Sequence, residues 1–339
     1  MAIFDHWHPM YAASKLGAQP ARVRLGGRDI VLFRGQDGQI GALDNMCVHR
    51  RMDLSRGCVI DGRLQCTYHG WTYDCAGNGE SPGTPKLHAK TNSYDTAIAH
   101  DYIWIKRAGA EATLPEFTLL DSFSHVGTLE HVINAPLELV LDNFTEVEHT
   151  PTTHANFGYD LSRMHEVETR VEPDESSIRV VNSGPQKKTP WVVAKLSGLR
   201  GGDRFVDDWT TYFSPVYTIY NQYWTDPATG EERRDRWRIW VFFNPLDDDR
   251  TQLVTFAFLR APSAGRRAFI TLTKPALRAL VNLEVNCDVK MLEQLASKDP
   301  ALEGMKLSRF DRVLGLNRDR IERIYRGNGK HAEVVAQEA

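Results

Sequence analysis

The first third of the chain alternates short apolar runs with turn residues. The apolar runs are Val23–Leu25, Ile30–Phe33 and Ile40–Leu43, and the turns between them are Gly26-Gly27 and Asp37-Gly38. Glycine pairs and Asp-Gly between apolar runs are typical of hairpins. Asn78-Gly79 predicts another tight turn, and the pattern ends near the apolar run at 102–107. We therefore expect residues 1–115 to form a small all-β domain.

The rest of the chain mixes helical and strand-like patterns. Residues 135–151 have helical periodicity, and residues 165–260 return to strands separated by turn signals. A long amphipathic helix is predicted to follow Pro275, in KPALRALVNLEVNCDVKMLEQLAS. A sheet flanked by helices is an α+β arrangement. We expect it to occupy residues 116–339.

Composition narrows the class of protein. The chain has 339 residues, 42% of them hydrophobic and 25% charged, which is the balance of a globular protein. Its formal charge of −3 gives no basic surface for nucleic acid. The N-terminus does not resemble a signal peptide, and no apolar run reaches the ~18 residues needed to span a bilayer. We expect a cytoplasmic enzyme that binds neither nucleic acid nor membrane.

The cysteines indicate a metal site. There are five, and four of them lie between residues 47 and 75. A chain of this length with so few and such clustered cysteines does not carry a disulfide framework. Beside histidines in a reducing compartment, such a cluster indicates metal binding.

Two half-sites combine a cysteine with a histidine. Cys47-x-His49 is followed, after 16 residues, by Cys66-x-x-His69. Each half offers one thiolate and one imidazole, which suits a two-iron cluster with both cysteines on one iron and both histidines on the other. Structural zinc is the alternative, because mixed cysteine and histidine sets also bind zinc.

The two half-sites resemble a known family. CVHRR, the gap and CTYHGW are similar to the Rieske domain of the non-haem iron oxygenases, which implies a [2Fe-2S] cluster bound by Cys47, His49, Cys66 and His69. Cys58 and Cys75 fall outside the motif and are interpreted as small buried residues. A visible spectrum separates the coloured cluster from colourless zinc.

A second candidate metal site lies in DNFTEVEHTPTTH, residues 142–154. Asp142, Glu146 and His149 are spaced to share one helical face. His149 and His154 would point apart on an unbroken helix, but Pro151 can turn the backbone so that both imidazoles meet. Capping of helix carbonyls or exposure to solvent is the alternative for this pair. The segment resembles the iron-binding helix of the same family.

A mononuclear iron of this type needs a carboxylate besides its two histidines. Asp288 lies within the predicted apolar stripe of the C-terminal helix, where a buried acid requires a partner. CDVKMLEQL resembles the family segment that supplies the third ligand, so Asp288 is the first choice and Glu284 the second; an ion pair or helix-cap contact is the structural alternative.

The resemblance also assigns roles near the iron. It implies that a carboxylate bridges a cluster histidine and an iron-bound histidine across a subunit interface, and Glu146 takes this position, where the family usually has aspartate. Asp142 is the alternative for the bridge. Asn143 matches a family asparagine beside the iron.

The substrate side is less defined. Aromatic residues are concentrated between Phe205 and Phe243. They are expected to line an apolar pocket over the iron in part, and to form ordinary sheet core for the rest.

The family resemblance implies the terminal oxygenase of a multicomponent system, with a helix-grip catalytic domain. Length and helix spacing are similar to a short homotrimeric branch that includes vanillate and dicamba O-demethylases. Such an enzyme would use O2, mononuclear Fe(II) and NAD(P)H-derived electrons from a flavin reductase, a ferredoxin or both, to hydroxylate or demethylate a small aromatic compound. The alternatives are a cis-dihydroxylating dioxygenase and a Rieske electron-transfer or ligand-binding protein without catalysis.

Overall fold

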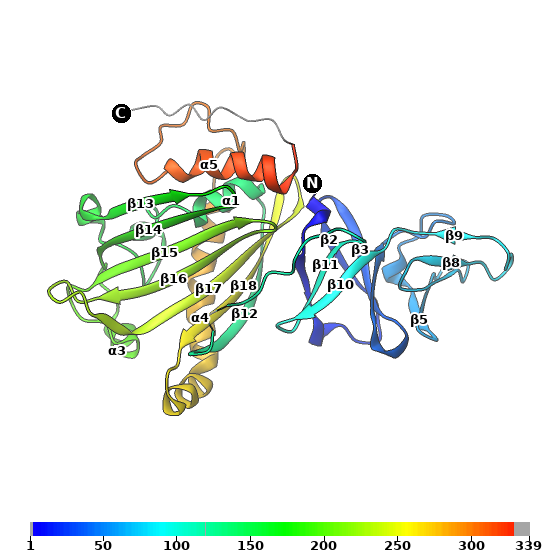
Figure 1. Ribbon diagram of the computed structural model, residues 1–339, viewed down its shortest axis with the longest axis horizontal. Helices are drawn as coiled ribbons and strands as arrows, with labels where there is room; N and C mark the ends of the chain where they lie inside the picture. The colour runs from blue at the N-terminus through cyan, green and yellow to red at the C-terminus, as the bar shows by residue number, and fades with distance from the viewer. Residues whose placement is uncertain (1–2, 119, 329–339) are drawn as a thin grey trace. The chain divides into compact units, whose positions relative to one another are not determined.

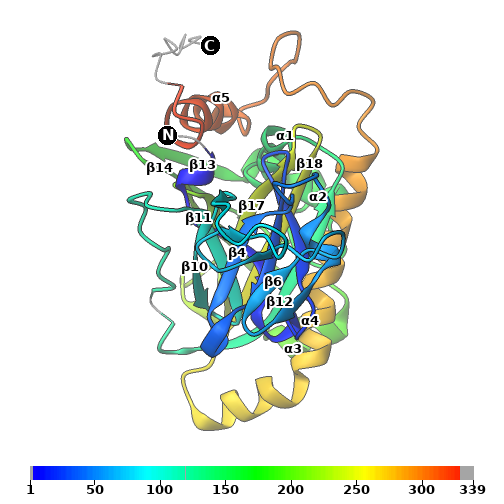
Figure 2. The same ribbon diagram turned by 90° about the vertical axis from the view of Figure 1, so that its right-hand side faces the viewer.

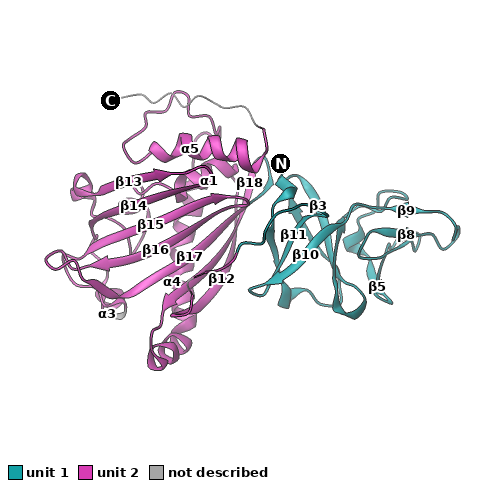
Figure 3. Ribbon diagram, in the orientation of Figure 1, with its two compact units in different colours: residues 1–115, 244–248 teal, residues 116–243, 249–339 magenta. Residues whose placement is uncertain are grey.

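The computed structural model describes residues 3–118 and 120–328 (Figure 1, Figure 2), so the expected C-terminal end of the second domain lies outside them. The chain divides into two compact units, residues 1–115 with 244–248 and residues 116–243 with 249–339 (Figure 3). None of the helices in the described residues combines the length and apolar character that crossing a membrane requires.

The first unit consists of strands and short 3₁₀ turns. Its sheets contain β1 (His8–Ala12), β11 (Tyr102–Arg107) and β10 (Tyr94–Ala99); β2 (Ala21–Leu25), β3 (Arg28–Arg34) and β4 (Ile40–Asp44); and β5 (Cys58–Ile60), β6 (Arg63–Gln65), β7 (Thr72–Tyr73), β8 (Asn78–Glu80) and β9 (Ala89–Lys90). The 3₁₀ turns are Ile3–Asp5, Ala13–Lys15, Gln36–Gly38 and Leu54–Arg56. The predicted apolar runs form β2, β3 and β4, which pair antiparallel. The all-β prediction is confirmed for this unit.

Strand β3 connects the two apolar cores of this unit. Side chains alternate across a strand, so Ile30 and Leu32 pack in one core while Val31 and Phe33 pack in the other. The second core also contains Cys47 and Cys66, which are buried together with Trp71 and Tyr73. Both cysteines are therefore anchored on a packed core.

The turn predicted at Asn78-Gly79 is wrong, because both residues lie in β8. The chain reverses just before them: Gly77 has a φ of +84°, and the Asn78 N–H donates to Asp74 Oδ1 at 2.8 Å. Gly79 is needed for close packing instead, since a Cβ there would come within 2.8 Å of the Tyr73 ring.

The second unit is built on one seven-stranded sheet, whose strands are all labelled in Figure 1. Its spatial order is β12 (Phe123–Ile133), β18 (Arg250–Arg260), β17 (Glu232–Asp247), β16 (Val216–Thr225), β15 (Arg204–Phe213), β14 (Ser177–Pro185) and β13 (Glu168–Pro173). The helices are α1 (Leu137–Phe144), α2 (Thr150–Thr153), α3 (Trp191–Ser197), α4 (Ala264–Glu293) and α5 (Arg312–Arg320), with a 3₁₀ turn at Leu161–Glu166 and a π turn at Ile321–Tyr325. The α+β prediction is confirmed.

Helix α4 is longer than predicted. It begins at Ala264, where the Ser263 hydroxyl accepts from the Arg266 N–H at 3.2 Å, and Pro275 lies inside it rather than before it. A proline removes one backbone donor and bends a helix without having to end it. Figure 2 shows the first part of α4, in yellow, at an angle to the rest.

The helix predicted over 135–151 is interrupted. Helix α1 ends at Phe144, whose carbonyl accepts from the Tyr220 hydroxyl. The Thr145 hydroxyl bonds back to Leu141 O at 2.7 Å. These bonds satisfy carbonyls at the helix end, and the chain then turns before α2. Asp142 and Glu146 consequently do not share a helical face, contrary to the prediction.

Candidate functional site

Cys47 and Cys66 begin two loops with the same backbone hydrogen bonds. In the first loop the Cys47 N–H donates to Met52 O, and the Arg51 N–H donates to Cys47 O, both at 2.8 Å. In the second loop the Cys66 N–H donates to the carbonyl five residues later at 2.8 Å, and the Gly70 N–H donates to Cys66 O at 3.1 Å. Arg51 and Gly70 both adopt positive φ angles, 60° and 71°. The structure thus brings the two half-sites into equivalent loops.

The loops bury their cysteines and expose their histidines. Cys47 and Cys66 are each 2% exposed, whereas His49 and His69 lie at the surface with ring centroids 4.5 Å apart. Residues 81–84 line a hollow beside both imidazoles. A redox centre held here would be insulated on its thiolate side and accessible on its imidazole side.

Tyr73 is a contact that the sequence reasoning missed. Its hydroxyl lies 3.1 Å from Cys47 Sγ, on the buried side of the loops. Hydrogen bonds to cluster sulfur atoms raise the reduction potential of an iron–sulfur centre. Tyr73 follows Trp71 in an ordinary strand pattern, which gave no sign of this role.

The four side chains of the first unit form a thiol pair and an imidazole pair. Cys47 and Cys66 are buried, whereas His49 and His69 are exposed. A two-iron cluster with both cysteines on one iron and both histidines on the other requires this division. The donor set therefore fits a [2Fe-2S] cluster.

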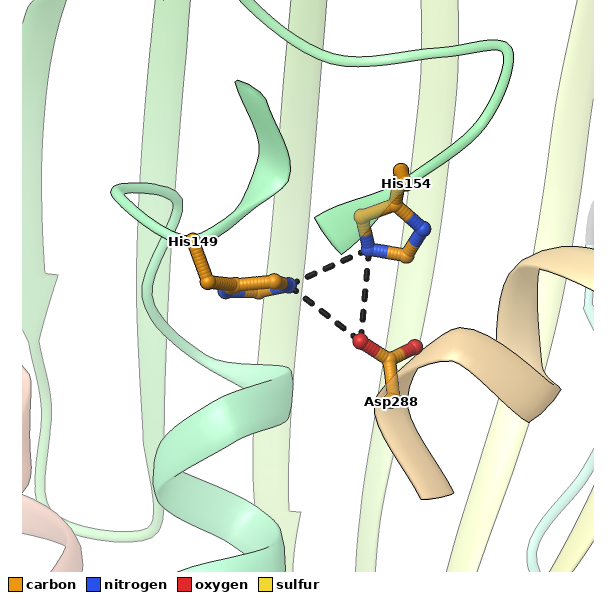
Figure 4. Close-up of side chains that lie close together, drawn as sticks. All are labelled: His149, His154 and Asp288. Atoms are coloured by element: carbon orange, nitrogen blue, oxygen red, sulfur yellow. Dashed lines mark hydrogen bonds and ion pairs between the residues drawn. The ribbon is translucent and has the colours of Figure 1, made fainter. Parts of the chain in front are cut away.

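His149, His154 and Asp288 meet at one point in the second unit (Figure 4). The two Nε2 atoms lie 3.1 Å apart, and each is 3.3 Å from Asp288 Oδ1. Two imidazoles and one carboxylate on one side, with the other side open, form the ligand set of non-haem iron sites. The donor set therefore fits an iron ion.

The local fold positions these three groups. His149 and His154 flank α2 as its N-cap and C-cap residues, so one turn of helix separates them. Pro151 occupies the first turn of α2, where its missing N–H costs nothing, so it does not break the helix as predicted. Helix α2 instead ends at His154, whose backbone is extended. Asp288 lies on the buried face of α4 and is 4% exposed.

Each histidine is oriented by a glutamate. Glu146 Oε1 binds His149 Nδ1, and Glu284 Oε2 lies 3.0 Å from His154 Nδ1. With Nδ1–H donated to a carboxylate, each imidazole directs the lone pair of Nε2 toward Asp288. Carboxylates that hold metal-binding histidines in this way are characteristic of metal sites. Glu284, the second choice for the third ligand, thus orients His154 through Nδ1 and does not belong to the three-residue group of His149, His154 and Asp288.

Asn143 and Asp142 separate in the structure. The Asn143 side chain donates to Asp288 Oδ1 at 3.0 Å, so it lies beside the candidate iron site. Asp142 turns away and forms a two-pronged ion pair with Arg318 at 2.6 and 2.8 Å. The Asp142 carboxylate holds α5 against α1, and it does not join His149, His154 and Asp288.

Carboxylates control the protonation of both imidazoles. Burial opposes the charged form of His149, but Asp288 and Glu146 outweigh it and raise the pKa of His149 to about 9. Asp288 and Glu284 likewise overcome burial and raise the pKa of His154 to about 10. Although burial acts against its ionised form, Asp288 has a pKa well below its usual range because of the two imidazoles. A cation that binds between the two Nε2 atoms therefore has to displace protons.

Lys187 is a second residue that the sequence reasoning missed. Its ammonium group donates to His154 O at 2.6 Å and to Pro151 O at 2.9 Å. These carbonyls end α2, where a cation is favourable. Lys187 therefore braces the turn that carries both histidines. It lies outside the 142–154 segment, so sequence spacing could not reveal it.

An aromatic cavity adjoins the three groups. It has a volume of about 130 Å³ and is bounded by His149, His154 and Asp288, by α4 and by one face of the sheet. Phe205, Trp209, Tyr220 and Trp237 line it, as the aromatic-rich segment suggested. Other aromatic residues of that segment, including Trp240 and Phe242, stack with Phe117 in the core. The cavity is comparable with the ~150 Å³ cavity that holds benzene in an engineered protein.

Glu284→Gln is expected to weaken metal binding by about 10- to 100-fold, the usual cost of losing a carboxylate that orients a metal-bound histidine. Equilibrium titration of metal-free protein with Co²⁺ measures this loss. Glu293→Gln, an exposed change on the same helix, should leave affinity unchanged. Equal affinities of the two variants would contradict the orienting role of Glu284.

Metal affinity is expected to rise with pH between about 6 and 8. A protonated imidazole cannot donate its lone pair, so binding must displace protons from groups whose pKa values are raised above neutrality. Affinity should increase about tenfold per pH unit for each proton released. Calorimetric titrations in two buffers of different ionisation enthalpy count these protons; affinity that is constant over this range would contradict the assignment.

Comparisons with known proteins match two separate parts of the chain to two known domains. Residues 6–95 match the Rieske [2Fe-2S] domain, and residues 133–325 match the vanillate O-demethylase oxygenase C-terminal domain. The chain is similar in fold to dicamba monooxygenase bound to 3,6-dichlorosalicylic acid, with a TM-score of 0.80 and 17% identity over 97% of this chain and 99% of that one.

Two curated relatives match different lengths of the chain. A 4beta-methylsterol monooxygenase of Methylococcus capsulatus is 27% identical over 272 residues, covering 76% of this chain and 69% of the relative. Chlorophyllide a oxygenase of Oryza sativa subsp. japonica is 36% identical over 131 residues, or 37% of this chain. This match spans only 24% of the rice protein.

Proposed function

Because the chain belongs to the Rieske oxygenases with a vanillate O-demethylase oxygenase C-terminal domain, we propose that it is the terminal oxygenase of a multicomponent system. It hydroxylates or oxidatively demethylates a small aromatic compound with O2. The convergence of His149, His154 and Asp288 beside an aromatic cavity carries this proposal. Residues 1–115 act as the Rieske domain and residues 116–339 as the catalytic domain.

The two donor sets divide the chemistry between them. Cys47, His49, Cys66 and His69 hold the [2Fe-2S] cluster, while His149, His154 and Asp288 hold mononuclear Fe(II). When bound, the cluster supplies single electrons and the iron activates O2 for insertion into the substrate.

The protein groups around these sites position the metal ligands and shield the substrate from water. Glu146 and Glu284 keep a proton on each Nδ1, so both Nε2 atoms remain available as donors. Asn143 fixes the rotation of the Asp288 carboxylate through its 3.0 Å hydrogen bond. Phe205, Trp209 and Trp237 present apolar surface to the substrate ring and exclude water from it.

Electrons reach the chain from a separate donor. We propose a flavin reductase, a ferredoxin or both, fed by NAD(P)H. The electron enters at the cluster and leaves it through the exposed ring of His69. We also propose a homotrimer, in which Glu146 of one subunit accepts a hydrogen bond from His69 of a partner subunit. We further propose that the protein works in the reducing cytoplasm, in keeping with five cysteines that form no disulfide.

Product analysis with isotopically labelled O2 tests this function. Protein supplied with a surrogate reductase is incubated with a panel of aromatic ethers, amines and acids. Incorporation of one labelled oxygen atom supports hydroxylation or demethylation, whereas two atoms in a cis-diol would identify a dioxygenase. Cluster reduction without any oxygenated product across the panel would favour an electron-transfer or ligand-binding protein and contradict the proposal.

A further inference from the structure

Asp207 is a buried acid on the sheet face that lines the cavity. It lies on β15 between Phe205 and Trp209, which share its face because side chains alternate along a strand, and it is 5% exposed. Asp208, the next residue, faces the other side and pairs with Arg179 at 2.9 Å. Asp207 therefore contributes its carboxyl group to the cavity wall.

The two oxygens of Asp207 differ in their partners. Oδ2 accepts a hydrogen bond from the Gln222 side chain, its cross-strand neighbour, at 3.2 Å. Oδ1 is buried and has no hydrogen-bond partner within the described part of the chain. A buried polar atom without a partner is costly, so its retention calls for an explanation.

A structural role would provide Asp207 with a cation. The other buried aspartates of this unit have one: Asp142 pairs with Arg318, Asp203 with Arg233, Asp235 with Arg266, and Asp288 with two histidines. Asp207 forms no ion pair with any described residue. Among the buried aspartates of the described part of this unit, Asp207 thus stands out as an acid in the cavity lining that has no cationic partner.

The charge of the cavity restricts that molecule. Four carboxylates line it, those of Glu146, Asp207, Glu284 and Asp288, and none of the described lining residues is arginine or lysine. A divalent ion would offset only two of these charges. A ring carboxylate would therefore enter a negative site without a cationic partner, which electrostatics disfavours.

We propose that Asp207 is a specificity-determining residue that selects uncharged ring substrates bearing an O–H or N–H donor, and rejects ring carboxylates. Oδ1 accepts the hydrogen bond, and Gln222 fixes the carboxyl group by holding Oδ2. This inference rests on the proposed function, because it assumes that the cavity is the substrate site.

Calorimetric binding to the intact, iron-loaded protein tests the selection without turnover, with air excluded. Two size-matched pairs of probes are used: 2-methoxyphenol against 2-methylanisole, and 2-methoxybenzamide against 2-methoxybenzoate. Burial raises the pKa of Asp207 to about 7, so measurements are made at pH 8, where the carboxyl group is largely ionised. The donor-bearing member of each pair should bind at least about tenfold more tightly.

Variants show whether Asp207 is responsible for the binding preference. Asp207→Leu should remove the preference within the first pair while binding 2-methylanisole within about threefold of the parent protein. It should weaken the preference within the second pair, because three other carboxylates of the cavity remain. Asp207→Asn, which preserves shape if the leucine variant does not fold, should weaken the preference. Asp208→Asn changes a carboxylate on the opposite face and should leave the preference intact.

Three results would overturn the selection: equal binding within either pair, an unchanged preference in Asp207→Leu, or no binding of any probe. Iron content measured on the same samples separates this inference from the proposed function. Selective binding by a protein that lacks mononuclear iron would contradict the function alone. Full iron content with no selection would contradict the role of Asp207 alone.

Discussion

Asp288→Ala is expected to abolish oxygenation while leaving the visible spectrum of the cluster unchanged. Asp288 Oδ1 lies 3.3 Å from both Nε2 atoms and supplies the anionic donor of the group. Without it, two imidazoles that lie 3.1 Å apart remain to bind a divalent cation. Turnover should fall by more than the ~10- to 100-fold typical of losing a group that merely orients a ligand.

Turnover with a surrogate reductase and iron content together measure this effect. Glu293→Gln serves as the control because it removes an exposed carboxylate from the same helix. The cluster should remain because its ligands belong to the other unit. Substantial oxygenation by Asp288→Ala would exclude Asp288 as a ligand.

His69→Cys is expected to lower the reduction potential of the cluster by hundreds of millivolts. Replacing a neutral imidazole with a thiolate adds negative charge to the cluster. Centres with two histidine ligands have potentials of about −150 to +300 mV, against about −400 mV for clusters with four cysteines. The change should also slow electron delivery, because the exposed His69 ring is the proposed exit for the electron.

A redox titration followed by visible absorption measures the potential, and single-turnover kinetics measure electron delivery. His88→Cys is the matched control, since it places a cysteine at another exposed histidine of the first unit. A His69→Cys variant with an unchanged potential and full oxygenation would contradict the assignment of His69.

The local features of both sites were predictable because short spacings determine them. The pairs around Cys47 and Cys66 predicted two matching half-sites, and the backbone hydrogen bonds of the loops that carry them repeat one another. Asp288 could be singled out because a charged residue interrupted an apolar stripe. The structure brings Asp288, His149 and His154 together; their binding of iron remains a prediction.

Other features depend on contacts between distant segments and could not be predicted. Helix α1 ends at Phe144 partly because Tyr220, 76 residues later, bonds to its carbonyl. Asp142 is drawn away from Glu146 by Arg318, which is 176 residues later in the chain. Helical periodicity assumes an unbroken helix and takes no account of such partners.

The residues that surround the candidate iron site are the hardest to predict from the sequence. The sequence predicts Glu284 as an alternative ligand because it borders the correct face of α4, but only the three-dimensional structure shows its carboxylate beside His154 Nδ1. Lys187 and Asp207 belong to segments with no motif. Their significance comes from what their polar atoms bond to, or fail to bond to, after folding.

The central claim is that one chain holds a two-iron cluster and a separate mononuclear iron. Iron analysis of the purified protein, paired with its visible spectrum, tests this most directly. We predict three irons per chain, and two in His149→Ala with the cluster spectrum retained. A parent protein with only two irons, or a colourless protein with stoichiometric zinc, would contradict the account.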